Sequence, residues 1–240
     1  MTPPIGEIWV YLSASPLLGL TVTLLAYQTA HWLYVRSGQR PLANPVLIAV
    51  AMLATLLWLT GTAYETYFAG AQFVHFLLGP ATVALAVPLY TQFKRVRSML
   101  LPISAGLLAG SLTAIISAVL IARLFGADLA TQASLAPKSV TTPIAMGIAE
   151  QIGGLPSLTA VLVIFTGVLG AIVGGRIFRL AGVSDPAICG FSLGVASHGI
   201  GTARAFQQDE QRGAFAALAM GLNGLLTALL LPVFAGWLIQ

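Results

Sequence analysis

A succession of long apolar runs dominates this sequence, and each run is long enough to cross a lipid bilayer as a helix. A helical span needs about 20 mostly apolar residues. Seven runs of about that length occupy residues 12–35, 44–62, 72–92, 99–123, 157–178, 186–206 and 213–238. Only 8% of the residues are charged, against about a quarter in soluble domains. The sequence therefore predicts an all-α integral membrane protein of about seven transmembrane helices, forming a single polytopic membrane domain over residues 1–240.

One apolar segment, residues 143–152, is too short to cross. It lies between the polar stretch 137–142 and the pair Gly153-Gly154. A segment of this length is typical of a re-entrant piece rather than a span. The sequence therefore predicts a re-entrant half-helix here.

Basic residues gather in the links after the first, third and fifth runs. They are Arg36 and Arg40, then Lys94, Arg95 and Arg97, then Arg176 and Arg179. Cytoplasmic links carry the excess of Lys and Arg, so all three links are expected in the cytoplasm and the N-terminus outside. This holds only if residues 143–152 turn back without crossing. Because the basic residues form no single stripe, the net charge of +4 does not indicate a nucleic-acid partner.

A weak internal repeat relates two parts of the chain. Residues 76–107 align with 191–222 without a gap and share eight identities. In the predicted topology the two segments run in opposite directions, which gives repeat halves of roughly 40–125 and 135–240. Inverted repeats with interrupted helices are typical of secondary transporters. The expected interruptions are Gly79-Pro80 and the Gly194 to Gly201 stretch, although a proline kink that serves only packing explains the first equally well.

The stretch 137–142 carries the first candidate binding residues. Thr142 before Pro143 has the pattern of a helix N-cap followed by proline in the first turn. The helix start would then face Lys138, Ser139 and Thr141. A helix N-terminus beside a lysine and hydroxyl groups favours a carboxylate. The alternative is an ordinary capped loop with a lysine at the membrane interface.

The second candidate stretch lies inside the sixth run. Ser197, His198, Gly201, Thr202 and Arg204 bring a titratable ring, hydroxyls and a cation into an apolar segment. Polar groups at membrane depth are costly and are therefore functional candidates. His198 could carry a proton, whereas Arg204 could simply extend to the outer surface. The sequence shows no hydrolase, metalloprotease or phosphate-loop motif, so we do not expect an enzyme, a cofactor or a metal centre.

The sequence resembles the LrgB/CidB family at four places. The resembling runs are Leu-Gly-Pro-Ala-Thr-Val-Ala-Leu-Ala at 78–86 with Pro-Leu-Tyr at 88–90, Pro-Lys-Ser-Val-Thr-Thr-Pro-Ile-Ala-Met at 137–146, Ala-Ser-His-Gly-Ile-Gly-Thr-Ala-Arg at 196–204, and Gly-Ala-Phe at 213–215. The family includes bacterial YohK proteins and the chloroplast-envelope glycolate/glycerate transporter. The resemblance implies a multi-pass protein of the bacterial inner membrane. Gln207 departs from the family, whose members often carry an acid there.

The resemblance and the residues together give two functional hypotheses. In the first, a secondary transporter binds glycolate, glycerate or pyruvate between Pro80, the stretch Lys138 to Thr142 and the stretch Ser197 to Arg204. The coupling ion is a proton or sodium. In the second, an antiholin-like regulator of murein hydrolase export acts with an LrgA/CidA-type membrane partner. In both cases we expect membrane lipid as the surroundings, a homo-oligomer and no nucleic acid.

Overall fold

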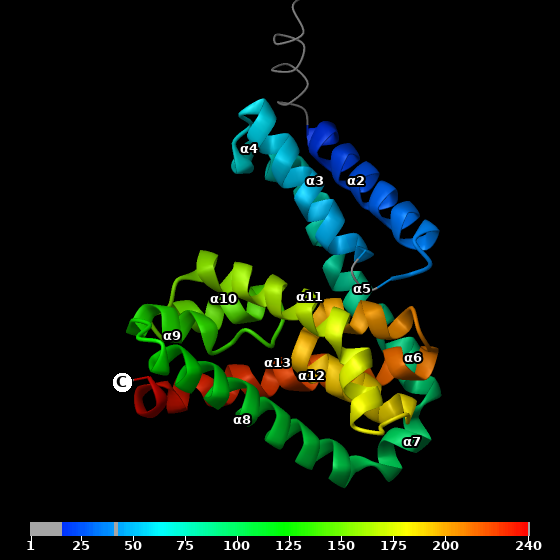
Figure 1. The fold of residues 1–240 in the computed structure, drawn as a ribbon, viewed down its shortest axis with the longest axis vertical. Helices are drawn as coiled ribbons and strands as arrows, with labels where there is room; N and C mark the ends of the chain where they lie inside the picture. Colours follow the sequence, from blue (N-terminus) through cyan, green and yellow to red (C-terminus); the bar gives the residue numbers. More distant parts are fainter. Residues whose placement is uncertain (1–15, 41–42, 240) are drawn as a thin grey trace, which may run out of the picture. The chain divides into compact units, whose positions relative to one another are not determined.

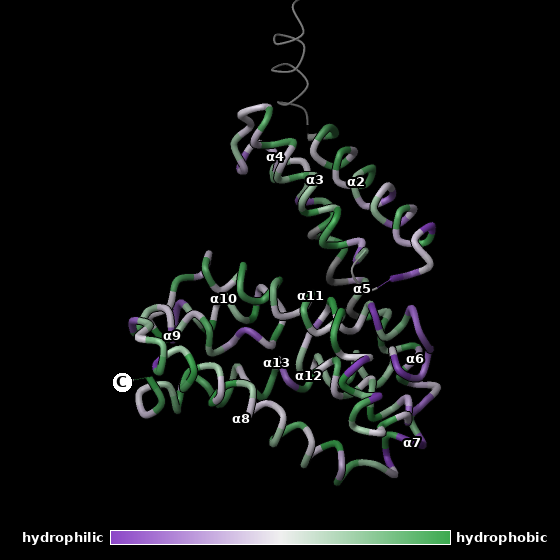
Figure 2. The backbone as a smooth tube through the Cα atoms, in the orientation of Figure 1, coloured by the Kyte–Doolittle hydropathy of each residue, from purple (hydrophilic) through white to green (hydrophobic). Residues whose placement is uncertain are grey.

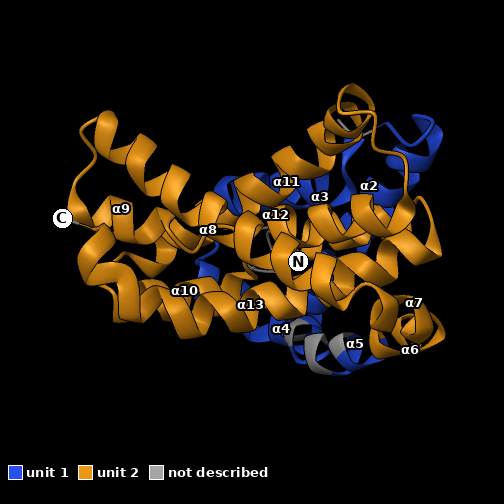
Figure 3. Cartoon of the chain, turned by 90° about the horizontal axis from the view of Figure 1, so that it is seen from below, with its two compact units in different colours: residues 1–84 blue, residues 85–240 orange. Residues whose placement is uncertain are grey.

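The computed structural model describes residues 16–40 and 43–239, and within these ranges the regular elements are helices, with no strand. The chain forms two compact units, residues 1–84 and 85–240 (Figure 3). The boundary lies inside the first of the two expected repeat halves. The first four residues of the predicted run 12–35 lie outside the described residues.

The first unit contains α2 (Pro16–Arg36), α3 (Pro45–Thr60), α4 (Tyr64–Phe76) and α5 (Leu78–Ala84) (Figure 1). Helix α3 begins where the Asn44 side chain accepts a hydrogen bond from the Val46 N–H at 2.9 Å, and it ends at Gly61 in the left-handed conformation. Helices α2 and α3 pack through buried Ala26, Ala30 and Ala49. Small side chains allow the two backbones to approach closely, as in other membrane helix pairs.

The third predicted run, 72–92, does not form one helix. The chain is interrupted at Leu77 and again at Leu85, so that α5 is followed by α6 (Ala86–Thr91) and α7 (Phe93–Ser98). Pro80 and Pro88 explain both breaks, because a proline cannot donate to the carbonyl four residues earlier and its ring clashes there. The interruption expected at Gly79-Pro80 therefore lies at Leu77, and a second one follows it.

The second unit continues with α8 (Leu100–Leu124), α9 (Leu129–Leu135), α10 (Thr142–Gln151), α11 (Pro156–Leu180), α12 (Pro186–Phe206) and α13 (Glu210–Leu238). Three helices of the described chain, α8, α11 and α13, are long and apolar enough to cross a membrane. Figure 2 shows them as mostly hydrophobic along their length. Helix α12 packs against both α11 and α13.

Glycine makes the contact between α12 and α13 close. A Cβ atom added at Gly190 would lie 2.1 Å from the Arg212 carbonyl oxygen, and one added at Gly194 would lie 2.2 Å from the Ala216 carbonyl oxygen. The backbone of α13 occupies the space that any larger side chain would need. These glycines therefore set the distance between the two helices.

The segments just before and just after α10 lie close together. The Leu155 N–H donates to the Ser134 hydroxyl oxygen at 2.7 Å, and the Thr159 hydroxyl donates to the Ser134 carbonyl at 3.0 Å. At the other end of this unit, the Arg95 guanidinium pairs with Asp185 at 2.5 Å. This ion pair joins α7, just before α8, to the start of α12, just after α11.

Candidate functional site

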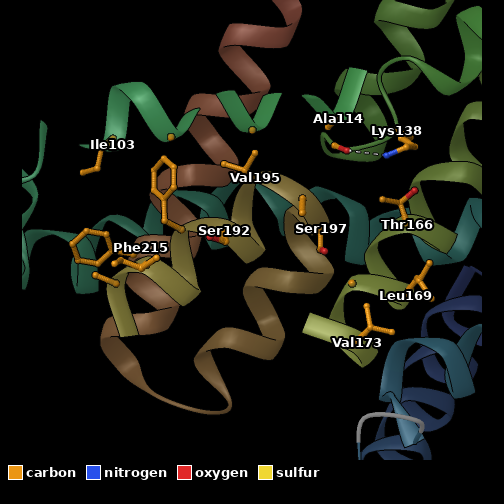
Figure 4. Close-up of a pocket in the computed structure, with 18 of the residues that line it drawn as sticks. Ile103, Ala114, Lys138, Thr166, Leu169, Val173, Ser192, Val195, Ser197 and Phe215 are labelled. Carbon is orange, nitrogen blue, oxygen red and sulfur yellow. Dashed lines mark hydrogen bonds between the residues drawn. The ribbon is translucent and has the colours of Figure 1, made fainter. Parts of the chain in front are cut away.

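A cavity of about 780 Å³ lies among α8, α11 and α12 and the loop between α9 and α10, all within the second unit (Figure 4). Its walls are mostly apolar, with Ile103, Val195 and Phe215 among them. Polar side chains interrupt this lining at five positions. They are Lys138, Ser139, Thr166, Ser192 and Ser197. A mostly apolar pocket with a few polar groups is the usual form of a small-molecule site.

The α9–α10 loop supplies the cation of this cavity. Lys138 is the one charged side chain among the described lining residues, and its Nζ lies 3.4 Å from the Ser139 hydroxyl oxygen (Figure 4). The loop is held by its own turn, in which the Lys138 N–H donates to the Leu135 carbonyl at 3.1 Å. It is also held by α13, because the Asn223 amide donates to the Ser139 carbonyl at 3.3 Å. The structure therefore places a positioned ammonium group at an apolar cavity.

Ser197 adds a second polar group from α12. Its side chain is 1% exposed, and its hydroxyl has no hydrogen-bond partner among the described residues. Helix α11 makes room for it with Gly170, where an added Cβ would come within 1.8 Å of the Ser197 hydroxyl oxygen. Leaving a buried hydroxyl unpaired costs about 1–3 kcal/mol. A ligand that hydrogen-bonds the Ser197 hydroxyl would remove this cost.

His198 lies next to Ser197 but has a different role. Its backbone has φ 42° and ψ −133°, which interrupts α12 between Gly194 and Gly201, in the expected stretch. Its Nε2 lies 2.9 Å from the Val163 carbonyl oxygen, so this nitrogen must carry the proton and donate. His198 does not line the cavity. Through this hydrogen bond, the imidazole connects the interrupted part of α12 to α11.

Two further predicted residues support the break in α12. The Thr202 hydroxyl donates to the His198 carbonyl at 2.8 Å. Gly201 is buried, and a Cβ added there would lie 2.6 Å from the Ser197 Cβ atom. Both residues shape the turn that presents Ser197. At the end of the helix, the Arg204 guanidinium lies 3.4 Å from the Gln207 amide oxygen.

The start of α10 differs from the sequence prediction by one residue. Thr141, not Thr142, is the N-cap, and its side chain makes no capping hydrogen bond. Thr142 already has helical geometry, and Pro143 remains within the first turn, where a missing N–H is tolerated. Neither threonine lines the cavity. Pro80 belongs to the first unit and is exposed.

Sequence reasoning missed three polar residues of this unit. Thr166 and Ser192 line the cavity, and Asn223 is a buried amide in the middle of α13. Asn223 could have been found, because it is an amide inside the apolar run 213–238. The two hydroxyl residues carry no such signal, since single Ser and Thr are common in membrane helices.

Comparison with known proteins identifies the family. The model of the LrgB-like family matches residues 23–237, which extends from α2 to α13 and includes the cavity. The chain belongs to the LrgB-like family. Among its relatives is YwbG of Bacillus subtilis (strain 168), 37% identical over 90% of this chain and 96% of that protein.

Other LrgB-family relatives carry a functional name. The antiholin-like protein LrgB of Bacillus cereus (strain B4264) is 31% identical over 92% of this chain and 96% of its own length. The antiholin-like protein LrgB of Bacillus anthracis (strain CDC 684 / NRRL 3495) matches to the same extent. No solved structure matches this LrgB-family chain.

Proposed function

We propose that this LrgB-family protein is a secondary transporter of small carboxylates of the glycolate, glycerate or pyruvate class. One observation supports this most directly: the unpartnered, buried Ser197 hydroxyl lines the same cavity as the Lys138 ammonium group and the Ser139 hydroxyl. An ammonium with hydroxyl donors beside it matches one carboxylate, and hydrogen bonds to a charged group are the strong ones.

The remaining wall of the cavity fits the non-ionic part of such a solute. Thr166 and Ser192 can hydrogen-bond a hydroxyl or keto oxygen, while Val195 and the apolar side chains exclude water. Nothing in this arrangement requires a bond to be made or broken, so we propose no enzymatic activity. Proton or sodium coupling would drive alternating access around the broken α12.

We further propose seven spans with α10 as a re-entrant half-helix in the bacterial inner membrane. The Arg95–Asp185 pair supports this topology, because it joins α7, which leads into α8, to the start of α12, which follows α11. The start of α8 and the end of α11 then share one side. The chain between α8 and α11 must then stay on the other side. The Leu155 N–H to Ser134 bond agrees with this reading, since the excursion through α10 begins and ends at one place.

The experiment is uptake of radiolabelled glycolate and pyruvate into proteoliposomes that contain only the purified chain. We expect saturable uptake by the wild type and loss of at least tenfold in Lys138→Ala, because the carboxylate loses its counter-charge. Lys94→Ala is the matched control, since Lys94 is the only other lysine and is exposed in α7. Equal uptake by Lys138→Ala and wild type would remove Lys138 from the site.

A second candidate function is regulation of murein hydrolase export together with an LrgA/CidA-type partner. The relatives named antiholin-like protein LrgB favour it. If the purified chain takes up no carboxylate, the partner is added to the same proteoliposomes. Uptake only with the partner would indicate a two-component transporter, and absence of uptake in both cases would favour the regulator. Chemical cross-linking in the same membranes tests the proposed homo-oligomer.

A further inference from the structure

A second polar cluster lies behind the cavity, where α8, α13 and the α9–α10 loop meet. It consists of Ser111, Ser139, Asn223 and Thr227, whose side chains are 2%, 6%, 1% and 2% exposed. Asn223 and Thr227 lie one turn apart on α13, and Ser111 lies opposite them on α8. Three of these buried polar side chains lie near the middle of the apolar helices α8 and α13, where polar groups are costly in a bilayer. Their position therefore requires a reason beyond packing.

The amide of Asn223 has a fixed orientation. Its nitrogen lies 3.3 Å from the Ser139 carbonyl oxygen and 3.1 Å from the Val195 carbonyl oxygen. Carbonyl oxygens can only accept, so the nitrogen must face them. The amide oxygen then faces the remaining space, and it has no hydrogen-bond partner among the described residues. A buried amide oxygen without a donor is a free ligand for a cation.

The hydroxyl pair has the spacing of cation ligands. The Ser111 and Thr227 hydroxyls form a long hydrogen bond with 3.4 Å between the oxygens, whereas hydroxyl hydrogen bonds are usually about 2.7–2.8 Å. Oxygen ligands lie about 2.4 Å from Ca²⁺, a cation of nearly the same radius as Na⁺. At that distance neighbouring ligands of an octahedral site are about 3.4 Å apart. The pair is therefore spaced as two adjacent ligands of such an ion.

The space between these residues is narrow. The void lined by Ser111, Ser139, Asn223 and Thr227 is too narrow for a water molecule. A water molecule therefore does not satisfy the Asn223 amide oxygen there. Na⁺ is smaller than water, whereas K⁺ is about as large. A space of this size would favour a dehydrated Na⁺ over the larger K⁺.

We propose that this cluster is a sodium site, formed by the hydroxyl oxygens of Ser111 and Thr227, the amide oxygen of Asn223 and an oxygen of Ser139. Na⁺ is a hard cation that prefers oxygen ligands, and all four residues supply neutral oxygens. No carboxylate takes part. In the described part of the chain, no cluster of three His, Cys, Asp or Glu residues competes for the ion.

Ser139 links this site to the carboxylate cavity. It lines both spaces, and the Lys138 Nζ lies 3.4 Å from its hydroxyl. The ammonium group repels a nearby Na⁺, and a bound carboxylate would cancel this repulsion. Sodium and carboxylate would then raise each other's affinity by the same factor. This coupling rests on the proposed transport function, whereas the binding of Na⁺ does not.

The first test needs no solute. The melting temperature of the purified full chain in detergent is measured as NaCl replaces KCl at constant ionic strength. When Na⁺ exceeds its dissociation constant about tenfold, we expect a rise of roughly 3 to 6 °C. Lys138→Ala removes the repelling charge and should enlarge this rise. Identical melting temperatures in NaCl and KCl, in both the wild type and Lys138→Ala, would overturn the sodium site.

Variants of the ligands localise the effect. Thr227→Val keeps the shape and removes one ligand, so the sodium-dependent rise should disappear. Ser111→Ala is a second variant with the same expectation. Thr113→Val is the control, because Thr113 is an exposed hydroxyl residue on the same helix α8. A rise that persists in both Thr227→Val and Ser111→Ala would place the ion elsewhere and contradict the proposal.

A third measurement separates the two proposals. If glycolate binds, saturating Na⁺ should lower its dissociation constant at least fivefold in the wild type and have no effect in Thr227→Val. A sodium-dependent rise in melting temperature without any carboxylate uptake would retain the sodium site and reject the transport function. Carboxylate uptake that does not depend on Na⁺, with no sodium-dependent rise in melting temperature, would retain the transport function and reject the sodium site.

Discussion

Ser197 shows at the level of one residue how the site differs from a packed core. A buried hydroxyl normally finds a partner, and in α12 the carbonyl four residues earlier is the usual acceptor. The Ser197 hydroxyl instead has no partner among the described residues and lies over Gly170 of α11. The unpaired Ser197 hydroxyl therefore lowers the stability of the fold, and its contribution to binding can be measured separately.

Ser197→Ala should leave the protein as stable as the wild type or slightly more stable. The substitution removes an unpaired buried polar group that costs about 1–3 kcal/mol. The apparent KM for carboxylate should rise roughly tenfold, because a hydrogen bond to a charged group is lost. Thermal unfolding and proteoliposome uptake measure the two effects. A clear loss of stability with unchanged KM would assign Ser197 to packing alone.

Gly170→Ala should impair the same site from the opposite helix. An added Cβ would lie 1.8 Å from the Ser197 hydroxyl oxygen and 3.0 Å from its Cβ atom, so the hydroxyl must turn away. Uptake should fall, as in Ser197→Ala. Gly175→Ala is the control, because a Cβ at this position on the same helix meets nothing within 4 Å. Equal uptake by Gly170→Ala and wild type would contradict a role for the hydroxyl orientation.

At the scale of elements, Asp185 joins the start of α12 to α7. Its carboxylate accepts from the Ala187 and Ile188 N–H groups at 2.8 and 3.2 Å and pairs with Arg95. Partial burial raises the pKa of this carboxyl, but the Ile188 and Ala187 hydrogen bonds and the Arg95 charge outweigh it and lower the pKa below 3.8. A lowered carboxyl pKa stabilises the folded state above pH 3.8, and this contribution is lost as the pH falls through the lowered value.

Asp185→Ala should destabilise the protein by about 1 kcal/mol through the lost cap. Asp185→Asn keeps an acceptor for both N–H groups and loses only the ion pair, so about 0.5 kcal/mol or less is expected for a partly exposed pair. Melting curves at pH 7 and below pH 3.8 distinguish the capping contribution from the ion-pair contribution. At the lower pH, the melting temperature of the wild type should approach that of Asp185→Asn. A difference in melting temperature between wild type and Asp185→Asn that grows on acidification would refute the role of the ion pair.

The contact of α12 with α13 depends on glycine. Gly194→Ala would place a Cβ atom 2.2 Å from the Ala216 carbonyl oxygen, and backbone must move to relieve it. We expect a loss of about 1–3 kcal/mol, as for other overpacked sites. Gly221→Ala on α13 meets nothing within 4 Å and should be neutral or stabilising, since alanine favours helix. Thermal unfolding compares the two, and equal effects would show that the interface tolerates a larger separation.

At the scale of the whole molecule, the proposed topology fixes the side on which each link is labelled. In a background with Cys189→Ala, Gln151→Cys at the exposed end of α10 should react with a membrane-impermeant maleimide from outside. Ser184→Cys, in the exposed link before α12, should react only from the cytoplasm. Cytoplasmic labelling of Gln151→Cys would mean that α10 crosses the membrane. Gly154 is unsuitable for a cysteine, because an added Cβ would lie 2.8 Å from the Ser134 nitrogen.

The sequence by itself determined the helical class, the family motifs and the positions of most helices, because these depend on local patterns. Apolar runs predicted α3, α8, α11, α12 and α13 to within a few residues, and Pro143 marked the first turn of α10. The lysine of the site was also visible locally, since Lys138 follows Pro137 in the specific stretch 137–146.

Only the tertiary structure decided which polar residues share a space. Ser197 and His198 are neighbours in the sequence, yet the positive φ of His198 turns one hydroxyl into the cavity and the imidazole onto the Val163 carbonyl. Asn223 reaches Ser139 across 84 residues. Such contacts depend on how the backbones of α11, α12 and α13 approach one another, and no local pattern of residues encodes that distance.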